Sequence, residues 1–228
     1  MRRNIVIASV ATAALIGGGA AGTMAFADGG GSSSGSQTAS HRSVAQQADS
    51  HRSSVQLKDG DEGSSEDATE AKAARIDAQD AIRAALQNTK GTVIAADLDN
   101  DSQGLVWEVD VLAKNNQWHQ VTIDPGNGKV LGSHVEHDDD DAEDAAQARS
   151  ALKGSSTSAL DAAKAASAKG KVTKVELDDD ATKAWEAETT SGKGHERDWH
   201  VSLHSSQVTV DHGDDDHGHD DDDDNDDD

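Results

Sequence analysis

The residues best suited to chemistry gather at the C-terminal end of the chain. Residues 211–228 contain twelve aspartates and three histidines and no apolar side chain. Imidazole nitrogens bind zinc, copper or nickel, and clustered carboxylates bind calcium. The candidate metal ligands are His212, His217, His219, Asp214, Asp215, Asp216 and Asp220. We expect weakly bound divalent cations such as calcium or zinc there and no other cofactor. The same run also suits a disordered, solubilising tail, because its like charges repel one another.

Two histidine motifs resemble zinc-protease signatures without matching them. His195 and His200 flank a glutamate, but a shared helix face needs histidines four residues apart, and these are five apart where a strand is expected. His134 and His137 flank Glu136 one residue short of the inverted motif, and the segment continues into aspartates. We therefore expect a strand start and a loop end at these places.

A third motif resembles a calcium-binding EF-hand loop. Its positions 1, 3, 5 and 12 are matched by Asp97, Asp99, Asp101 and Glu108. Position 6 is Ser102, where the loop requires glycine, and strands rather than helices are expected on both sides. A solvated hairpin turn is the expected structure, with a calcium site as the alternative.

Composition argues against an enzyme and against nucleic-acid binding. The chain has 228 residues, no cysteine, 2% aromatic residues and a formal net charge of −24. The lack of cysteine excludes disulfides, thiol catalysis and thiolate metal sites. So acidic a chain repels phosphate backbones. No nucleophile, base and orienting residue can be assembled from the motifs, so we expect no catalytic activity.

The N-terminal residues have the pattern of an export signal. Arg2 and Arg3 precede an apolar run over residues 5–16, and small residues then lead to Ala27. This pattern predicts a signal peptide over residues 1–27 and a secreted or cell-envelope protein without stable membrane insertion after cleavage. An uncleaved anchor is the alternative, although the run is shorter than the roughly 20 residues that span a bilayer. Residues 28–67, rich in Gly, Ser and acidic residues, predict a disordered linker.

The first folded unit is predicted over residues 68–136. Apolar residues three and four apart between Ala71 and Leu86 predict an amphipathic helix, with Asp77 as its N-cap. Alternating apolar residues then predict strands over residues 93–98, over residues 105–112 and around Val121, with a short strand at residues 129–132. An acidic linker, residues 137–150, follows.

The second unit, residues 151–210, repeats the first at offsets of 78 to 81 residues. Ser158 stands where Asp77 stands, and Trp185 where Trp107 stands. An internal duplication explains this pattern, and the copies are expected to lean on each other, because a lone unit of about sixty residues buries only about 60% of its surface.

Residues 76–131 resemble the PepSY domain. They carry a helix of the form Ile-Asp-x-x-x-Ala, then Trp-Glu-Val-Asp-Val, then Val-x-Ile-Asp-x-x-x-Gly-Lys-Val-Leu. Residues 157–210 resemble a diverged copy, in which His204-Ser205-Ser206-Gln207 replaces the Asp-x-x-x-Gly-Lys ending. The resemblance implies an α+β fold of two tandem units, each a helix followed by a three-stranded antiparallel sheet.

The family resemblance also implies a function. It implies a secreted, non-enzymatic module that binds an extracellular or cell-envelope protein, a peptidase being one such partner, and it brings no catalytic residues. The alternative from the residues alone is a cell-envelope protein that binds divalent metals through its Asp/His-rich segments. An exposed strand edge or an open sheet face able to take an extended peptide would favour protein binding.

Overall fold

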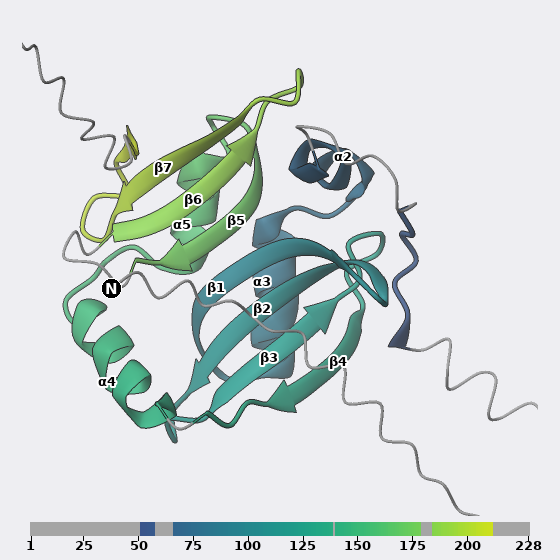
Figure 1. Ribbon diagram of the computed structural model, residues 1–228. Coiled ribbons are helices and arrows are strands. Elements are labelled where there is room, and N and C mark those ends of the chain that lie inside the picture. The colour runs from purple at the N-terminus through teal and green to yellow at the C-terminus, as the bar shows by residue number, and fades with distance from the viewer. Residues whose placement is uncertain (1–50, 58–65, 139, 179–183, 212–228) are drawn as a thin grey trace, which may run out of the picture. The chain divides into compact units, whose positions relative to one another are not determined.

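The computed structural model describes residues 51–57, 66–138, 140–178 and 184–211. Within them the chain forms an α+β fold around one antiparallel sheet of eight strands, in the order β4-β3-β2-β1-β5-β6-β7-β8 (Figure 1). The strands are β1 (Gly91–Asp101), β2 (Gly104–Ala113), β3 (Trp118–Ile123), β4 (Val130–Val135), β5 (Lys171–Leu177), β6 (Ala184–Thr190), β7 (Glu196–Ser202) and β8 (Val208–Val210). The described helices are α2 (Glu66–Ala73), α3 (Ala78–Asn88), α4 (Asp141–Ala151) and α5 (Ala159–Ala166).

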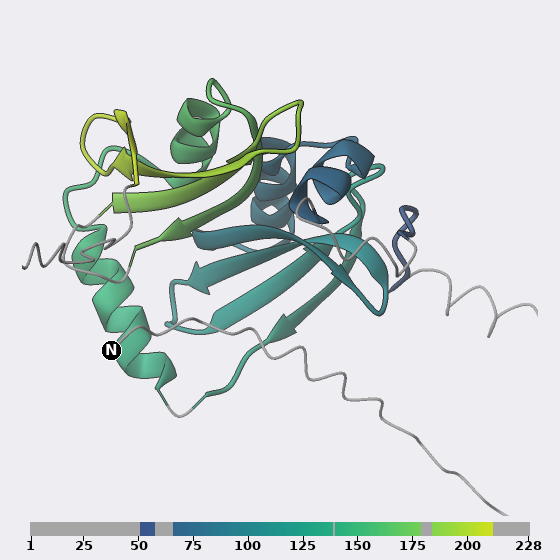
Figure 2. The same ribbon diagram turned by 45° about the horizontal axis from the view of Figure 1, so that its top comes forward.

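Helices α3 and α5 pack on the same face of the sheet, behind the strands in Figure 1 and again together in Figure 2. Both present small side chains to it: Ala78, Ala81, Ile82 and Ala85 of α3 and Ala159, Ala162, Ala163 and Ala166 of α5 are buried. Alanine has the highest helix propensity and lets a helix lie close to a sheet. Apart from Ile82, neither helix buries a large side chain, so most of the bulk of the core comes from the strands.

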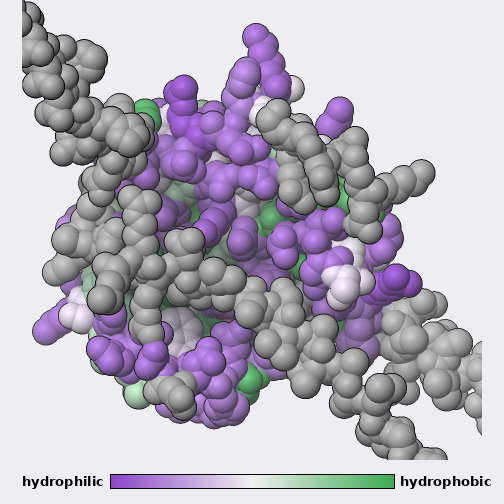
Figure 3. Space-filling view, viewed as in Figure 1, coloured by the Kyte–Doolittle hydropathy of each residue, from purple (hydrophilic) through white to green (hydrophobic). Residues whose placement is uncertain are grey.

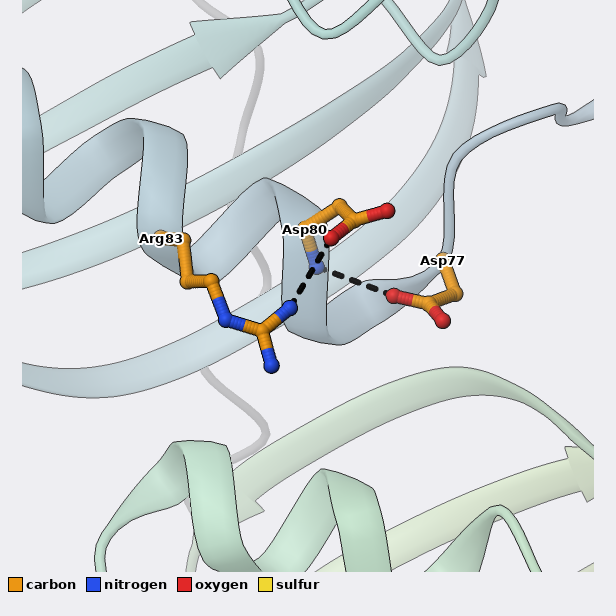
Figure 4. A network of polar contacts seen from close by, with 3 residues as sticks. All are labelled: Asp77, Asp80 and Arg83. Carbon is orange, nitrogen blue, oxygen red and sulfur yellow. Dashed lines mark hydrogen bonds and ion pairs between the residues drawn. The ribbon is translucent and has the colours of Figure 1, made fainter.

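Each of these helices begins at the cap that the sequence predicts. The Asp80 amide donates to Oδ1 of Asp77 at 2.9 Å, and Arg83 pairs with Asp80 one turn further on (Figure 4). Ser158 and Asp161 form a reciprocal capping box at the start of α5. A side-chain oxygen at the N-cap satisfies a helix amide that has no partner within the helix.

The core lies between these two helices and the sheet. Alternate residues of each strand point into it, and Trp107 and Trp185 are its largest fully buried side chains. The two tryptophans occupy equivalent positions in the two copies. The indole N–H of Trp185 donates to the Thr157 carbonyl at 3.0 Å, whereas the indole N–H of Trp107 has no hydrogen-bond partner among the described residues.

The two copies join through β1 and β5. These strands are antiparallel, and Ala96 lies opposite Val175. Ala96 and Val175 are also equivalent positions of the two copies. A pseudo-twofold axis that relates the copies therefore passes through this pair. The copies therefore share one sheet and one core, in which α3 also contacts α5.

The structure adds detail that the sequence did not predict. Each copy has four strands rather than the three that the family resemblance implies: β4 includes most of the short strand predicted at residues 129–132, and β8 pairs along the outer side of β7. The segment predicted as an acidic linker contains α4, whose Ala145 and Ala148 pack against Ile94 and Leu112. Within the predicted N-terminal linker, residues 51–57 hydrogen-bond to the hairpin turns: the Leu105 amide donates to the Val55 carbonyl, and the Ser54 hydroxyl donates to Asp124.

Replacement of each equivalent tryptophan by phenylalanine should have unequal effects. Trp185→Phe leaves the Thr157 carbonyl without its donor, whereas Trp107→Phe removes an indole N–H that has no partner among the described residues. We expect Trp185→Phe to lower the free energy of unfolding by about 1–2 kcal/mol more than Trp107→Phe. Urea denaturation followed by far-UV circular dichroism measures both. Equal losses would show that the Thr157 hydrogen bond contributes nothing.

Candidate functional site

The face of the sheet opposite α3 and α5 carries rows of polar side chains that cross the strands. In register, one row is His134, Gln120, Asp110, Ala95, Glu176, Glu186, His200 and Thr209. The next row is Gly132, Thr122, Glu108, Asp97, Lys174, Glu188 and Asp198. We call this surface the acidic face. Figure 3, viewed from this side, shows mainly hydrophilic residues where the surface is coloured.

The duplication places acids at equivalent positions in both halves of the acidic face. Glu108 corresponds to Glu186, because each follows one of the equivalent tryptophans. By the same alignment Asp110 corresponds to Glu188, and Asp97 to Glu176. Strand alternation puts all of them on one side, since successive side chains point to opposite faces. Among the residues of the two rows, Lys174 is the one lysine or arginine, and its Nζ lies 3.0 Å from Glu176.

Burial holds the carboxyls of the first copy partly protonated near neutral pH. Desolvation, with Glu136 and Glu108 nearby, raises the pKa of Asp110 to about 8. Oδ1 of Asp110 has no hydrogen-bond partner among the described residues. Desolvation also raises the pKa of Glu108 to about 7 and that of Asp97 to about 6. The Glu108 side chain is buried and accepts one hydrogen bond, from Nε2 of Gln120 at 3.2 Å.

The second copy repeats this electrostatic pattern. Desolvation, with Glu176 and Asp178 nearby, raises the pKa of Glu186 to about 7. Desolvation also raises the pKa of Glu188 to about 8, and a hydrogen bond with the Asp67 side chain of α2 adds to the shift. Two carboxyl groups in hydrogen-bond contact share a proton, because both cannot be ionised at low cost.

Two helices flank the acidic face. The helix α4 covers its β2–β3 end, where the Trp118 indole donates to the Asp141 carbonyl and Arg149 donates to the Ala113 carbonyl. The helix α2 contacts β1, β5 and β6, and Lys171 at the start of β5 donates to the carbonyl oxygens of Ala71 and Ala74. The two helices lie on opposite sides of the sheet centre in Figure 1 and in Figure 2.

The residues that the sequence singled out have different positions. The metal candidates of the tail, His212 to Asp220, lie outside the described residues. The EF-like motif forms the β1–β2 hairpin, in which Asp97 and Glu108 lie opposite each other on adjacent strands. The two histidines of the zinc-protease-like motif are not brought together on a helix: His195 is exposed in the turn before β7, and His200 lies half-buried on the strand.

Register assembles one set of ligands that the sequence analysis missed. One ligand atom each of Asp178, Glu186 and His200 lies within 4.8 Å of the others. Their separation in sequence hides this group, because it depends on the pairing of β5, β6 and β7. The signal available was alternation: Glu186 and His200 both occupy polar positions between buried residues of their strands.

The fold and this face define a two-copy α+β module with one helix-covered face and one polar face. The family model described as "Peptidase propeptide and YPEB domain", PepSY, matches residues 75–134 and 140–205. The chain belongs to the PepSY family. Both tandem matches agree with the two copies that share the sheet.

Other comparisons are sparse. No curated protein matches the chain. Among solved structures, a lipoprotein candidate from Clostridium difficile 630 is similar at 19% identity and a TM-score of 0.37, over 60% of this chain and 91% of that one. In the described part of the chain, no helix is long and apolar enough to cross a membrane. The family is one of non-catalytic, propeptide-like modules and fits an extracellular or envelope protein.

The stability of the fold should fall as pH rises through the neutral range. The folded form keeps the proton of Asp110 up to about pH 8, whereas the unfolded carboxyl, of pKa near 3.8, loses it much earlier. Folding therefore takes up a proton in this window, and each such proton lowers the free energy of unfolding by about 1.4 kcal/mol per pH unit. Asp110→Asn should flatten this slope and stabilise the protein at pH 8.

Urea denaturation at pH 5, 6.5 and 8 measures the slope. Glu143→Gln, at an exposed carboxylate of α4, is the control and should leave the slope unchanged. Parallel profiles for wild type and Asp110→Asn would contradict a buried proton at Asp110.

Proposed function

We propose that this protein is a secreted or cell-envelope binding module that holds a protein partner on its acidic face and restrains a peptidase. The supporting observation is the face itself: two rows of carboxyl groups cross the sheet on the side opposite α3 and α5, and Lys174 is the one lysine or arginine in the rows. The peptidase as partner class rests on the family description. Export rests on the pattern of residues 1–27, which lie outside the described residues.

The electrostatics favour a cationic partner. Carboxyls that burial keeps protonated up to pH 7 or 8 ionise more readily when a lysine or arginine side chain comes close. Neighbouring strands lie about 4.8 Å apart, so one basic side chain of a partner can contact carboxyls on two adjacent strands. The formal charge of −24 adds long-range attraction that speeds the encounter.

A second candidate function is divalent-cation binding, the activity first suggested by the Asp/His-rich tail. The specific observation in its favour is the group of Asp178, Glu186 and His200, which lies in the folded part of the chain. The two functions are separable, because a peptidase partner would contact the whole acidic face and a cation only one end of it.

Removal of charge from the acidic face should weaken binding far more than the same change in the tail. The face variant combines Glu108→Gln, Asp110→Asn, Glu186→Gln and Glu188→Gln. The tail control replaces Asp221, Asp222, Asp223 and Asp224 by asparagine. Inhibition of a thermolysin-type peptidase secreted by the source organism is measured with a small fluorogenic peptide. We expect saturable inhibition by the wild-type protein, at least tenfold weaker with the face variant and changed less than twofold with the tail control.

Two further readouts locate the contact. Zero-length carbodiimide coupling should link lysines of the peptidase to carboxyls of the acidic face, and binding should be tighter at pH 8.5 than at pH 6, since the face ionises in between. If the face and tail variants weaken inhibition equally, the interaction depends on net charge alone and not on the acidic face. Cleavage of the protein as an ordinary substrate, without inhibition, would sink the peptidase proposal.

A further inference from the structure

Three potential metal ligands meet at the end of β5. Asp178 follows the last residue of β5, Glu186 lies on β6, and His200 lies on β7 directly opposite Glu186. Their ligand atoms all lie within 4.8 Å of one another. Two of the three positions are fixed by strand pairing, and the Asp178 amide donates to the Ala184 carbonyl at 3.0 Å, which fixes the third. The group therefore needs no rearrangement of the backbone to bind an ion.

The surroundings favour a cation at this place. Asp178 is 5% exposed, and Glu186 and His200 are half-buried. Glu176 lies directly opposite Glu186 and brings a third carboxylate close, while Lys174 is engaged with Glu176 at 3.0 Å. Packing carboxylates together away from water is costly unless a positive charge lies among them.

We propose that Asp178, Glu186 and His200 bind one divalent transition-metal ion of the Zn²⁺ type. One imidazole and two carboxylates form a ligand set used for zinc, manganese and iron in proteins, and three protein ligands leave positions for water or a partner's side chain. A neutral imidazole selects such ions over calcium and magnesium, which prefer oxygen ligands throughout. Asp211 lies beside the same group, with Oδ2 at 3.8 Å from Nε2 of His200. A carboxylate near a metal-binding histidine orients the ring.

The duplication supplies an internal comparison. The positions equivalent to Asp178, Glu186 and His200 in the first copy are Asp99, Glu108 and Thr122. Both acids recur, but a threonine replaces the histidine, and the described residues of the first copy form no comparable group of ligands. The imidazole on β7 therefore distinguishes the two halves of a similar surface. This site is separate from the tail histidines and goes beyond the proposed partner binding.

The test uses the full-length mature chain, with Zn²⁺ and Co²⁺ as probes. Because tail histidines also bind such ions, a tail variant, His212→Ala/His217→Ala/His219→Ala, serves as the background. Competition with a chromophoric chelator measures the Zn²⁺ affinity and stoichiometry, and visible absorption of Co²⁺ reports on the ligand set. We expect the tail variant to keep one site that prefers Zn²⁺ to Ca²⁺ and Mg²⁺ by at least a hundredfold.

Substitutions within the group decide the assignment. His200→Ala and Glu186→Gln, each in the tail-variant background, should weaken Zn²⁺ binding at least tenfold and change the Co²⁺ spectrum. Glu108→Gln, the equivalent change in the first copy, should leave both unaltered. Circular dichroism checks that each variant folds, and the His200 ring resonances of the tail variant should shift with one equivalent of Zn²⁺. Loss of stoichiometric binding in the tail variant, or unchanged binding after His200→Ala, would overturn the proposal.

Discussion

The antiparallel pairing of β1 with β5 is the interaction on which the rest of the structure depends. Each copy alone has a short helix lined with alanines and a half-buried sheet, which bury too little apolar area to be stable. Pairing at Ala96 and Val175 removes two strand edges at once and brings α3 against α5. The small side chains at the axis are required by this arrangement, because two helices and two strands converge there. Duplication thus turns two marginal units into one core.

The same pairing creates the functional surface. Both core helices lie on one side of the shared sheet, so the acids of both copies come together on the other side in continuous rows. In a single copy β1 or β5 would be an edge strand, and Asp97 or Glu176 would be better hydrated there. At the centre of eight strands, flanked by α2 and α4, they lose water, and burial raises their pKa values toward neutrality. The acidity of the face and its protonation near pH 7 therefore have one structural cause.

Local features of this fold were predictable from sequence, and features that depend on register were not. Asp77 and Ser158 cap their helices through contacts only three residues long, and alternation identifies the buried strands. The sequence did not predict how the two copies join, because no local sequence feature specifies that β1 pairs with β5. The alanines of α4 have little amphipathic pattern, so the acidic composition of its segment predicted a linker. The group of Asp178, Glu186 and His200 could not be predicted, because it forms only when β5, β6 and β7 pair in register. The tail ligands were suggested by composition alone and stay a prediction.

The two copies differ in how they compensate for buried acids, and this difference suggests a division of roles. In the first copy, Asp110 keeps a proton, and Glu108 accepts a hydrogen bond from Gln120, so neutral groups offset the burial. In the second copy, Glu188 likewise keeps a proton, and in addition Lys174 and His200 stand at positions held by Ala95 and Thr122 in the first. A lysine offers a permanent charge and an imidazole offers a metal ligand, so the second copy is compensated by groups that also bind ions. Protons, metal ions and a partner's basic side chains would all compete for these carboxylates, because each relieves the same desolvated charge. Occupancy of the acidic face by any one of them must therefore depend on pH and on the supply of the others.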